Sequence, residues 1–363
     1  MTGINNVVRH RDVFRRPGHF AAWPANYGLW SWENELAVVF ADGKLGAQGA
    51  LHARDKAHEF RPLQARSMDG GETWSAEPFT GFIPGGKGLS ADEHVAAELR
   101  SGPRIADGEI IPLSKPINFM DRELALMVAR TGLDGRARSW FYVTRNRGRK
   151  WEGPFSFTGL HDAGLASRTD VIPLSESHAL FMMTASKEDG TEGRCLCAET
   201  TDGGLSFHRK SFLPFDGEGY AIMPSSARFS DGSILSVIRR GKTADRPGWL
   251  EAFRSEDEGT TWQAAGIPVE DTGIGGNPGS LALLEGERVA LVYGYRGDNP
   301  GIRMVTSSNG GRDWSESIDI RRDAELPDIG YPRCVVLRDA CLLVVYYYNF
   351  GRERFIAAST VRV

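Results

Sequence analysis

The sequence predicts an all-β protein, specifically a six-bladed β-propeller with four antiparallel strands in each blade. Three observations lead to this prediction. An eight-residue motif recurs five times, short β-rich runs are bounded by glycine-rich turns, and no stretch has the period of a long helix. Recurrence of one unit is typical of repeat architectures, in which each unit buries its apolar face only against its neighbours.

The repeated motif begins with Ser or Thr and has Asp or Asn at its third position, glycine at its fifth and an aromatic residue at its eighth. Its copies occupy residues 67–74, 144–151, 200–207, 255–262 and 307–314. An Asp or Asn side chain accepts hydrogen bonds from the backbone of its own turn, and glycine supplies a positive φ. The motif is therefore predicted to be a hairpin turn followed by a packing aromatic, and its residues are not catalytic candidates.

Short β-rich runs follow one another along the whole chain. The runs with the strongest strand character are residues 35–41, 178–185, 194–200, 233–239, 249–254, 288–296, 302–306, 341–348 and 354–361. Each later motif follows an outer strand and is preceded by a hairpin such as 227–235, which gives four strands per repeat. The five motifs close five blades, and residues 331–363 supply three more strands. Residues 6–14 are expected to add the fourth strand of the sixth blade and so close the ring.

The first interval between motifs is the longest. It contains a segment rich in glycine and proline, residues 82–89, which is expected to belong to an insertion over one face of the ring. Seven blades remain an alternative if this interval also contains a degenerate blade. In either case residues 1–363 are expected to form a single β-propeller domain, because a closed repeat array can exceed the usual size of a domain.

The composition is that of a soluble globular protein, with 41% hydrophobic residues, 25% charged residues and a net charge of −4. This charge gives no reason to expect nucleic acid or an anionic membrane as a partner. No run of about 18 apolar residues is present that would span a membrane. Residues 1–12 are polar and lack the apolar core of a secretory signal, which predicts a cytoplasmic protein, or a secreted or periplasmic one if an N-terminal segment has been removed.

The four cysteines are too few for a disulfide scaffold and are predicted to be free thiols. Cys195 and Cys197 are two residues apart in an expected strand, so they share a face and are expected to pack there. No spacing of cysteines and histidines resembles a zinc site. Neither a metal nor another cofactor is therefore expected.

An aromatic stretch at residues 23–32 contains three tryptophans. Tryptophan rings stack on the faces of sugars, which would suit a carbohydrate-binding cleft. The first blade also needs aromatic packing against its neighbour, and this second explanation is favoured for Trp30 and Trp32.

The repeated turns have the form of Asp-box motifs, and together with six blades they resemble the sialidase superfamily over essentially the whole chain. Sialidases bind a carboxylate with three arginines, and the resemblance nominates one residue for each. Arg15 lies in an Arg-x-Pro element, and Arg239 ends a hairpin that begins Asp-Gly-Ser. Arg296 precedes the fifth motif, with Arg303 as the alternative for this third arginine. Such convergence has a physical reason, because the planar fork of a guanidinium group matches a carboxylate.

The resemblance also nominates catalytic residues. Tyr331, in a Gly-Tyr-Pro element that opens the last blade, is placed like the tyrosine nucleophile of sialidases. Asp55 is placed like their acid/base aspartate, a dozen residues before the first motif. His52 and Arg54, in the same short segment, are expected to contact the substrate. The glutamate that assists the tyrosine in sialidases is replaced here by Met223, so the phenol lacks an obvious base. Glu218, nearby in the sequence, is an alternative if its loop is shifted.

The function implied by this resemblance is that of an exo-acting glycoside hydrolase that cleaves a terminal acidic sugar from a glycan. Met223 keeps other functions open. In a polysaccharide lyase, arginines would neutralise a uronate and Tyr331 or His52 would remove the neighbouring proton. A glycosidase for a neutral sugar and a non-catalytic carbohydrate-binding propeller are further alternatives. The expected partner is in each case a carbohydrate, an acidic sugar or oligosaccharide in the leading hypothesis.

Overall fold

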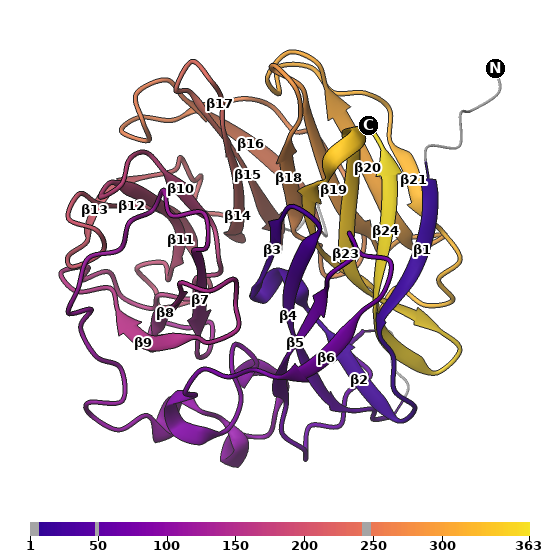
Figure 1. Cartoon of the computed structure of the whole chain (residues 1–363), viewed down its shortest axis with the longest axis horizontal. Coiled ribbons are helices and arrows are strands. Elements are labelled where there is room, and N and C mark those ends of the chain that lie inside the picture. Colours follow the sequence, from indigo (N-terminus) through magenta and orange to yellow (C-terminus); the bar gives the residue numbers. More distant parts are fainter. Residues whose placement is uncertain (1–6, 48–50, 242–247) are drawn as a thin grey trace.

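A computed structural model of the protein describes residues 7–47, 51–241 and 248–363. Strands make up almost all of its regular structure, and the helices of the described residues are short 3-10 turns of three residues each. The all-β prediction is confirmed. The sheets are arranged about a common centre: β14, β18 and β3 lie near the middle of the molecule, and β13, β17 and β21 lie toward its edge (Figure 1).

Three sheets contain four antiparallel strands each, paired in chain order. The first comprises β10 (Val171–Pro173), β11 (Ala179–Ala185), β12 (Arg194–Thr200) and β13 (His208–Phe212). The second comprises β14 (Tyr220–Arg228), β15 (Ile234–Gly241), β16 (Gly248–Ser255) and β17 (Gln263–Ala264). The third comprises β18 (Gly279–Leu283), β19 (Val289–Tyr295), β20 (Gly301–Ser307) and β21 (Ile318–Arg321). A smaller sheet has three strands, β7 (Ala125–Arg130), β8 (Ser139–Thr144) and β9 (Glu152–Ser156).

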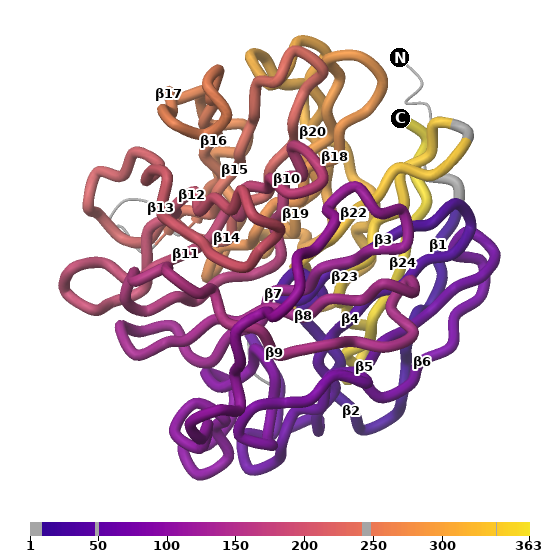
Figure 2. The backbone as a smooth tube through the Cα atoms, turned by 60° about the vertical axis from the view of Figure 1, so that its left-hand side comes forward, coloured from indigo at the N-terminus to yellow at the C-terminus, as the bar shows by residue number. Residues whose placement is uncertain are grey.

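The two ends of the chain share one nine-stranded sheet. Its N-terminal strands are β1 (Val7–Phe14), β2 (His19–Ala22), β3 (Gly28–Trp32), β4 (Glu35–Lys44), β5 (Arg61–Ser67) and β6 (Ser75–Pro78). Its C-terminal strands are β22 (Gly330–Val336), β23 (Cys341–Phe350) and β24 (Glu353–Arg362). β2 pairs with both β4 and β24, and β1 pairs antiparallel with β24 (Figure 2). The expected pairing of the first strand with the last is thus confirmed for residues 7–14, while residue 6 lies outside the described residues.

Central strands of these sheets are buried on both faces. In β11, Phe181 and Met183 pack in one apolar cluster with Phe141 of β8, whereas Leu180 and Met182 pack in another on the opposite face. Successive side chains of a strand point to opposite faces, so a strand between two packed sheets needs apolar residues at every position. This requirement explains why six of the seven residues of β11, the strand at the predicted run 178–185, are apolar.

All five copies of the repeated motif form the same turn. The hydroxyl of the first residue donates to the Asp or Asn at the third position and accepts from the N–H of the fifth residue. The third side chain also accepts from the N–H of the seventh residue. In the first copy these distances are 2.8 Å, 2.8 Å and 2.9 Å. The predicted role of the motif as a hairpin turn is confirmed.

The expected insertion occupies residues 79–124, between β6 and β7. In place of strands it contains four 3-10 turns, at Pro84–Gly86, Asp92–His94, Ala97–Leu99 and Gly102–Arg104. The N–H of Ser90 donates to the carbonyl of Arg130 at 3.1 Å, and the Ser90 hydroxyl accepts from the N–H of Arg130 at 3.2 Å. The insertion is therefore tied to the end of β7, and the following turn reaches the candidate site described below.

All four cysteines are free thiols, as predicted. Cys195 and Cys197 lie in the same apolar cluster, which also contains Ile238 of β15. No helix in the described part of the chain has the length and apolar character needed to cross a membrane.

Replacement of Asp69 by alanine is expected to lower the free energy of unfolding by about 1–2 kcal/mol, because N–H groups of its own turn lose their acceptor. Urea unfolding followed by tryptophan fluorescence measures the change. Asp69→Asn keeps one acceptor oxygen and is expected to retain most of the stability. Glu77→Ala, an exposed position on β6, is the control. Equal unfolding midpoints for Asp69→Ala and Glu77→Ala would show that the turn does not depend on this carboxylate.

Candidate active site

Tyr331 lies at the start of β22 in an unusual backbone conformation. Its φ of 51° is in the left-handed region, which residues with a Cβ rarely adopt. Asn277 holds the turn: its Oδ1 accepts from the N–H of Tyr331 at 2.8 Å, and its Nδ2 donates to the carbonyl of Ile329 at 3.1 Å. A Cβ on Gly330 would lie 2.3 Å from Asn277 Nδ2, so only glycine fits there. The Gly-Tyr pair therefore fixes the direction in which the phenol projects.

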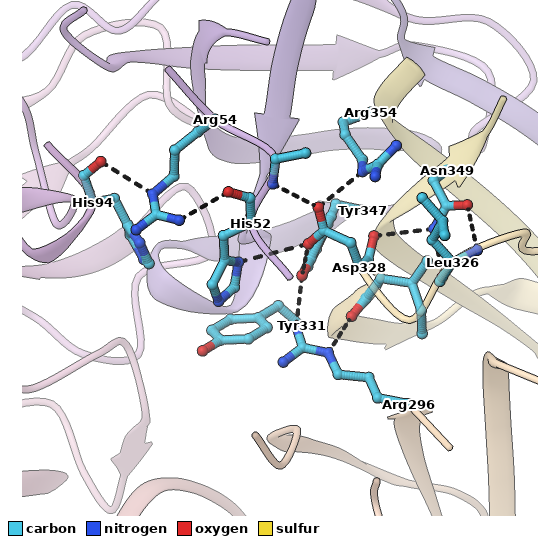
Figure 3. Close-up of polar contacts among 12 residues, drawn as sticks. His52, Arg54, His94, Arg296, Leu326, Asp328, Tyr331, Tyr347, Asn349 and Arg354 are labelled. Carbon is cyan, nitrogen blue, oxygen red and sulfur yellow. Dashed lines mark hydrogen bonds and ion pairs between the residues drawn. The ribbon is translucent and has the colours of Figure 1, made fainter. Parts of the chain in front are cut away.

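The Tyr331 phenol lies between two buried arginines from other sheets. Arg239, in β15, donates from Nη1 to the Tyr331 hydroxyl oxygen at 3.0 Å. The guanidinium carbon of Arg296, directly after β19, lies 5.5 Å from the centre of the Tyr331 ring (Figure 3). Arg239 is 8% exposed and Arg296 is 1% exposed. Three residues that sequence resemblance nominated, far apart along the chain, thus meet at one place.

These arginines change the acidity of the phenol. Burial raises the pKa of Tyr331, but the guanidinium groups of Arg239, Arg296 and Arg168 outweigh it, so the pKa lies below the ordinary value of 10.0. A phenolate is a stronger nucleophile and base than a phenol. The site therefore favours the reactive form of this tyrosine.

Two more arginines lie close enough for their charges to interact with Tyr331. Arg168 donates to the neutral side-chain oxygen of Asn26 at 2.9 Å. Burial, together with the charge of Arg130, lowers the pKa of Arg168 to about 9. Arg130 is itself paired with Glu93, at 3.0 Å for one of its contacts. The excess of positive charge at this site suits an anionic ligand.

Asp328 is a fully buried carboxylate in this region (Figure 3). It accepts from the N–H of Ala53 at 3.0 Å, from Arg354 Nε at 2.8 Å and from the Tyr347 hydroxyl at 3.1 Å. His52 Nδ1 lies 3.6 Å from Asp328 Oδ1. Burial raises the pKa of this carboxyl, but His52 and Arg354 more than offset that effect and lower it below the ordinary value. Asp328 thus holds the loop after β4 against β23 and β24.

Two histidines and a tryptophan form a wall beside Asp328. The rings of Trp23 and His94 are stacked, with centroids 3.7 Å apart, and the centroids of His52 and His94 are 5.0 Å apart. Arg54 donates to the backbone carbonyls of both histidines, at 2.9 Å and 3.1 Å. Burial lowers the pKa of both imidazoles, that of His94 to about 3. Both rings are therefore neutral near pH 7, and Arg54 acts by positioning them.

The structure does not bring Asp55 to this group, contrary to the sequence-based nomination. Its carboxylate pairs with His58 at 2.7 Å and accepts from the N–H of Ala57 at 2.9 Å, and its side chain is 34% exposed. Separation along the chain identified the correct loop. In this loop the N–H of Ala53 donates to Asp328, and the N–H of Asp55 donates to the carbonyl of Lys44. These two hydrogen bonds place His52 at the site, whereas the side chain of Asp55 stays in its own turn.

Arg15 also lies away from Tyr331. Its guanidinium group pairs with Glu353 and lies 4.5 Å from the centre of the Phe355 ring. Phe355 follows Arg354, which contacts Asp328, and successive residues of a strand point to opposite faces. Arg15 is therefore on the other face of β24. The Arg-x-Pro element that contains Arg15 therefore matches the sialidase sequence pattern, but its arginine does not lie at the candidate site.

The site contains functional groups that sequence reasoning missed. They are Trp23, Glu93, His94, Arg130, Arg168, Asp328, Tyr347 and Arg354. Asp328 had a signal, since it lies three residues before Tyr331, and Trp23 belongs to the aromatic stretch noted above. Tyr347 belongs to a run of three tyrosines in β23, and the others are arginines among many or residues of the insertion. Nothing in their local sequence distinguishes them.

No carboxylate stands at the position of the sialidase glutamate. Met223 occupies it, and its sulfur accepts from Arg239 Nη1 at 3.6 Å. Glu192, in the loop between β11 and β12, is a carboxylate whose charge acts on Arg239. Burial works against ionisation of Arg239, but the charges of Tyr220, Tyr331 and Glu192 raise its pKa. Glu192 therefore acts on the same guanidinium group as the phenol. Among the described residues no group of three or more His, Cys, Asp or Glu side chains is placed to hold a metal ion.

Comparison with known proteins identifies the class of fold. No protein-family model and no curated protein matches the chain. It is similar to a solved structure of a protein of unknown function from Dyadobacter fermentans, with 19% identity, a TM-score of 0.73 and 98% of each chain covered. It is also similar to the NanB sialidase of Streptococcus pneumoniae, with 13% identity, a TM-score of 0.61, and 97% of this chain and 70% of that chain covered. An α-L-arabinanase of Penicillium chrysogenum gives 12% identity, a TM-score of 0.58 and 98% of each chain covered.

The sialidase and the arabinanase share the sialidase-like β-propeller fold, and the present chain has this fold too. The predicted propeller class is thereby confirmed. At such low identity the likeness concerns the fold, and the chemistry has to be argued from the residues of the site.

His94→Gln is expected to flatten the dependence of stability on pH in weakly acidic solution. Burial lowers the pKa of His94 from 6.5 to about 3, so below pH 6.5 the unfolded chain binds a proton there that the folded chain does not. This contribution is fully present above pH 6.5 and is lost as the pH falls, by roughly 2 kcal/mol down to about pH 5.

Thermal unfolding of the wild type and of His94→Gln, each measured in neutral and in weakly acidic buffer, gives the comparison. The wild type is expected to lose more stability on acidification than the variant. An equal loss in both proteins would mean that the imidazole is not held neutral in the folded state.

Proposed function

We propose that the protein is a glycoside hydrolase that removes a terminal acidic sugar from a glycan, with Tyr331 as nucleophile. The observation that carries this proposal is the Tyr331 phenol, which is hydrogen-bonded to Arg239 and has a lowered pKa although it is buried. The sialidase-like fold supports a glycosidase as the general class. The arginines supply the preference for an acidic sugar.

In this mechanism the sugar carboxylate binds against Arg239 and Arg296. The Tyr331 oxygen then attacks the anomeric carbon, forming a glycosyl–tyrosine bond as the bond to the leaving oxygen breaks. Glu192, whose charge acts on Arg239, accepts the phenol proton where the tyrosine is not already ionised. Water later cleaves the glycosyl–tyrosine bond and restores the enzyme.

The leaving oxygen requires a proton, and His52 is the group placed to supply it. Burial and the charges of His94 and Arg296 lower the pKa of His52, whereas Asp328 raises it. A bound sugar carboxylate offsets the charge of Arg296 and so raises the pKa of His52 toward the range in which it carries a proton. Asp55 is not proposed for this role, because its carboxylate is held in its own exposed turn.

We also propose that the chain is one domain of six blades. Four blades correspond to the sheets that begin with β7, β10, β14 and β18. The nine-stranded sheet divides into a blade of β3, β4, β5 and β6 and a blade of β22, β23, β24 and β1, joined by β2. The insertion stands where the blade of β7 lacks a fourth strand, which favours six blades over seven.

Tyr331→Phe and Arg239→Gln are expected to reduce kcat/KM on a fluorogenic glycoside of an acidic sugar by about a hundredfold or more, because each removes a group that acts on the reacting centre. Sialosides and glucuronides are both assayed. Arg15→Gln and Asp55→Ala are the matched controls and are expected to stay within about threefold of the wild type, since neither side chain reaches the site. A control that loses as much activity as Tyr331→Phe, or no turnover of any acidic glycoside by the wild type, would contradict the proposal.

A uronate-specific polysaccharide lyase is the second candidate, and the position of His52 favours it. A neutral imidazole near Asp328 can remove the proton next to a uronate carboxylate that the arginines neutralise, and Tyr331 can protonate the departing oxygen. The products would be an unsaturated uronate and a free hydroxyl, with no water consumed.

Ultraviolet absorbance during incubation with polyuronates separates the two reactions, because only elimination creates a conjugated double bond. If the protein is a lyase, the wild type is expected to increase the absorbance and His52→Gln to abolish the increase. If it is a hydrolase, reducing sugar is released without any absorbance change. Saturable glycan binding without either product would favour the non-catalytic alternative.

A further inference from the structure

The insertion between β6 and β7 contributes an aromatic ring to the candidate active site. This ring belongs to His94, the last residue of the 3-10 turn Asp92–His94. The buried carboxylate of Asp92 accepts from the N–H of Ser101 at 2.8 Å and from the N–H of Gly102 at 2.7 Å. The turn is thus anchored within the insertion, which holds the backbone of His94 in place.

Stacking fixes the ring of His94. The ring lies on the face of the fully buried Trp23, with an angle of 14° between the two ring planes. Its Nε2 lies 3.5 Å from a carboxylate oxygen of Glu93, and its Nδ1 has no hydrogen-bond partner among the described residues. The position of this imidazole therefore depends on its contact with Trp23.

His94 is not itself suited to transfer a proton. Its side chain is 10% exposed, and burial lowers its pKa to about 3, so the imidazole is a weak base that stays neutral from weakly acidic to neutral pH. The side chain of His52, in contrast, is 20% exposed and remains open to a ligand. An effect of His94 on the reaction would therefore be exerted through His52.

The orientation of the His52 ring depends on packing. Its Nδ1 lies 3.6 Å from Asp328 Oδ1, beyond hydrogen-bonding distance, and has no hydrogen-bond partner in the described part of the chain. The ring centroid lies 5.4 Å from that of Trp23 and 5.0 Å from that of His94. Arg54 donates to the backbone carbonyls of both histidines and so fixes the spacing between them (Figure 3). The stacked pair is thus the surface against which the His52 ring is oriented.

The charges around His52 do not depend on His94 near neutral pH. Burial lowers the pKa of His52, and the charges of Arg296 and Arg54 act in the same direction, whereas Asp328 raises it. The other titratable or charged groups nearby are Glu93, beside His94, and Tyr347 and Arg354, which contact Asp328. Because the imidazole of His94 is neutral, replacing it with an uncharged side chain changes the packing of His52 and leaves these charges as they are.

We propose that His94 is a positioning residue, whose ring, stacked on Trp23, holds the imidazole of His52 in the orientation that proton transfer requires. This role needs an aromatic ring at position 94 and does not need a second group that binds protons. The part of His52 in the chemistry rests on the proposed function, and it is the same residue in the hydrolase and in the lyase. The positioning itself can be measured without turnover.

The test compares His94→Phe, which keeps an aromatic ring on Trp23, with His94→Ala, which removes it. NMR of histidine-labelled protein follows the protonation of His52, whose signals are assigned with His52→Gln. In the wild type and in His94→Phe, the titration midpoint of His52 is expected to lie well below 6.5. In His94→Ala the ring becomes more exposed, and the midpoint is expected to rise toward 6.5 by about one pH unit or more.

Kinetics on whichever acidic glycoside or polyuronate the wild type converts supply the second measurement. His94→Ala is expected to lower kcat by about tenfold or more with a smaller change in KM, because a misdirected acid or base is inefficient. His94→Phe is expected to restore kcat to within about threefold of the wild type. His208→Ala is the matched control and is expected to change neither measurement, since His208 is exposed on β13 and pairs with Glu199.

A midpoint of His52 that is the same in the wild type, His94→Phe and His94→Ala overturns the proposal. A midpoint that rises equally in both variants also overturns it, because a stacked ring would then not suffice. Should His94→Ala fail to fold, His94→Leu fills the space without a planar ring and is expected to raise the midpoint in the same way. If the wild type converts no acidic glycan, the proposed function fails, while a midpoint raised in His94→Ala and retained in His94→Phe still supports the positioning role.

Discussion

The candidate site depends on one fully buried carboxylate, that of Asp328. Its oxygens accept hydrogen bonds from the loop after β4, from β23 and from β24, which are brought together only when the two ends of the chain share a sheet. Removing a charge from water is costly unless it is paired and hydrogen-bonded, and here both conditions are met. The same carboxylate is hydrogen-bonded to Arg354, and its Oδ1 lies 3.6 Å from His52 Nδ1. The pairing of the two chain ends in one sheet therefore also fixes the geometry of the site.

The concentration of positive charge around Tyr331 is the second constraint on the candidate site. The arrangement of sheets about a centre places the ends of β15, β19 and β22 side by side, so that Arg239, Arg296 and Tyr331 converge. Concentrating guanidinium groups in a buried place opposes stability, as the lowered pKa of Arg168 indicates. A bound anion relieves this repulsion, and the phenolate form of Tyr331 relieves part of it when no ligand is present. The same buried arginines therefore repel one another and make the Tyr331 phenol more reactive.

Much of the fold could be predicted because its signals are local. Turns such as that of residues 67–74 satisfy their hydrogen bonds within eight residues, and the strands show continuous apolar runs where both faces are covered. The Gly330–Tyr331 pair was nominated by its resemblance to the sialidase element, and the structure adds a physical reason for it, because the backbone there requires glycine followed by a held left-handed residue. Prediction failed for Arg15 and Asp55, because their spacing along the chain matched the sialidase pattern but did not specify the direction in which their side chains point.

The sequence by itself determined the all-β class, the repeated turns and the free cysteines, since each depends on a few neighbouring residues. Its resemblance to sialidases nominated Arg239, Arg296 and Tyr331, which meet at the site. Only the tertiary structure decided which face of β24 an arginine occupies, that the insertion stacks His94 on Trp23, and that Asp328 is the central carboxylate. These outcomes follow from how sheets distant in sequence pack and twist against one another. A one-residue step along a strand reverses the direction of a side chain, so that packing, rather than spacing, selects the residues that meet.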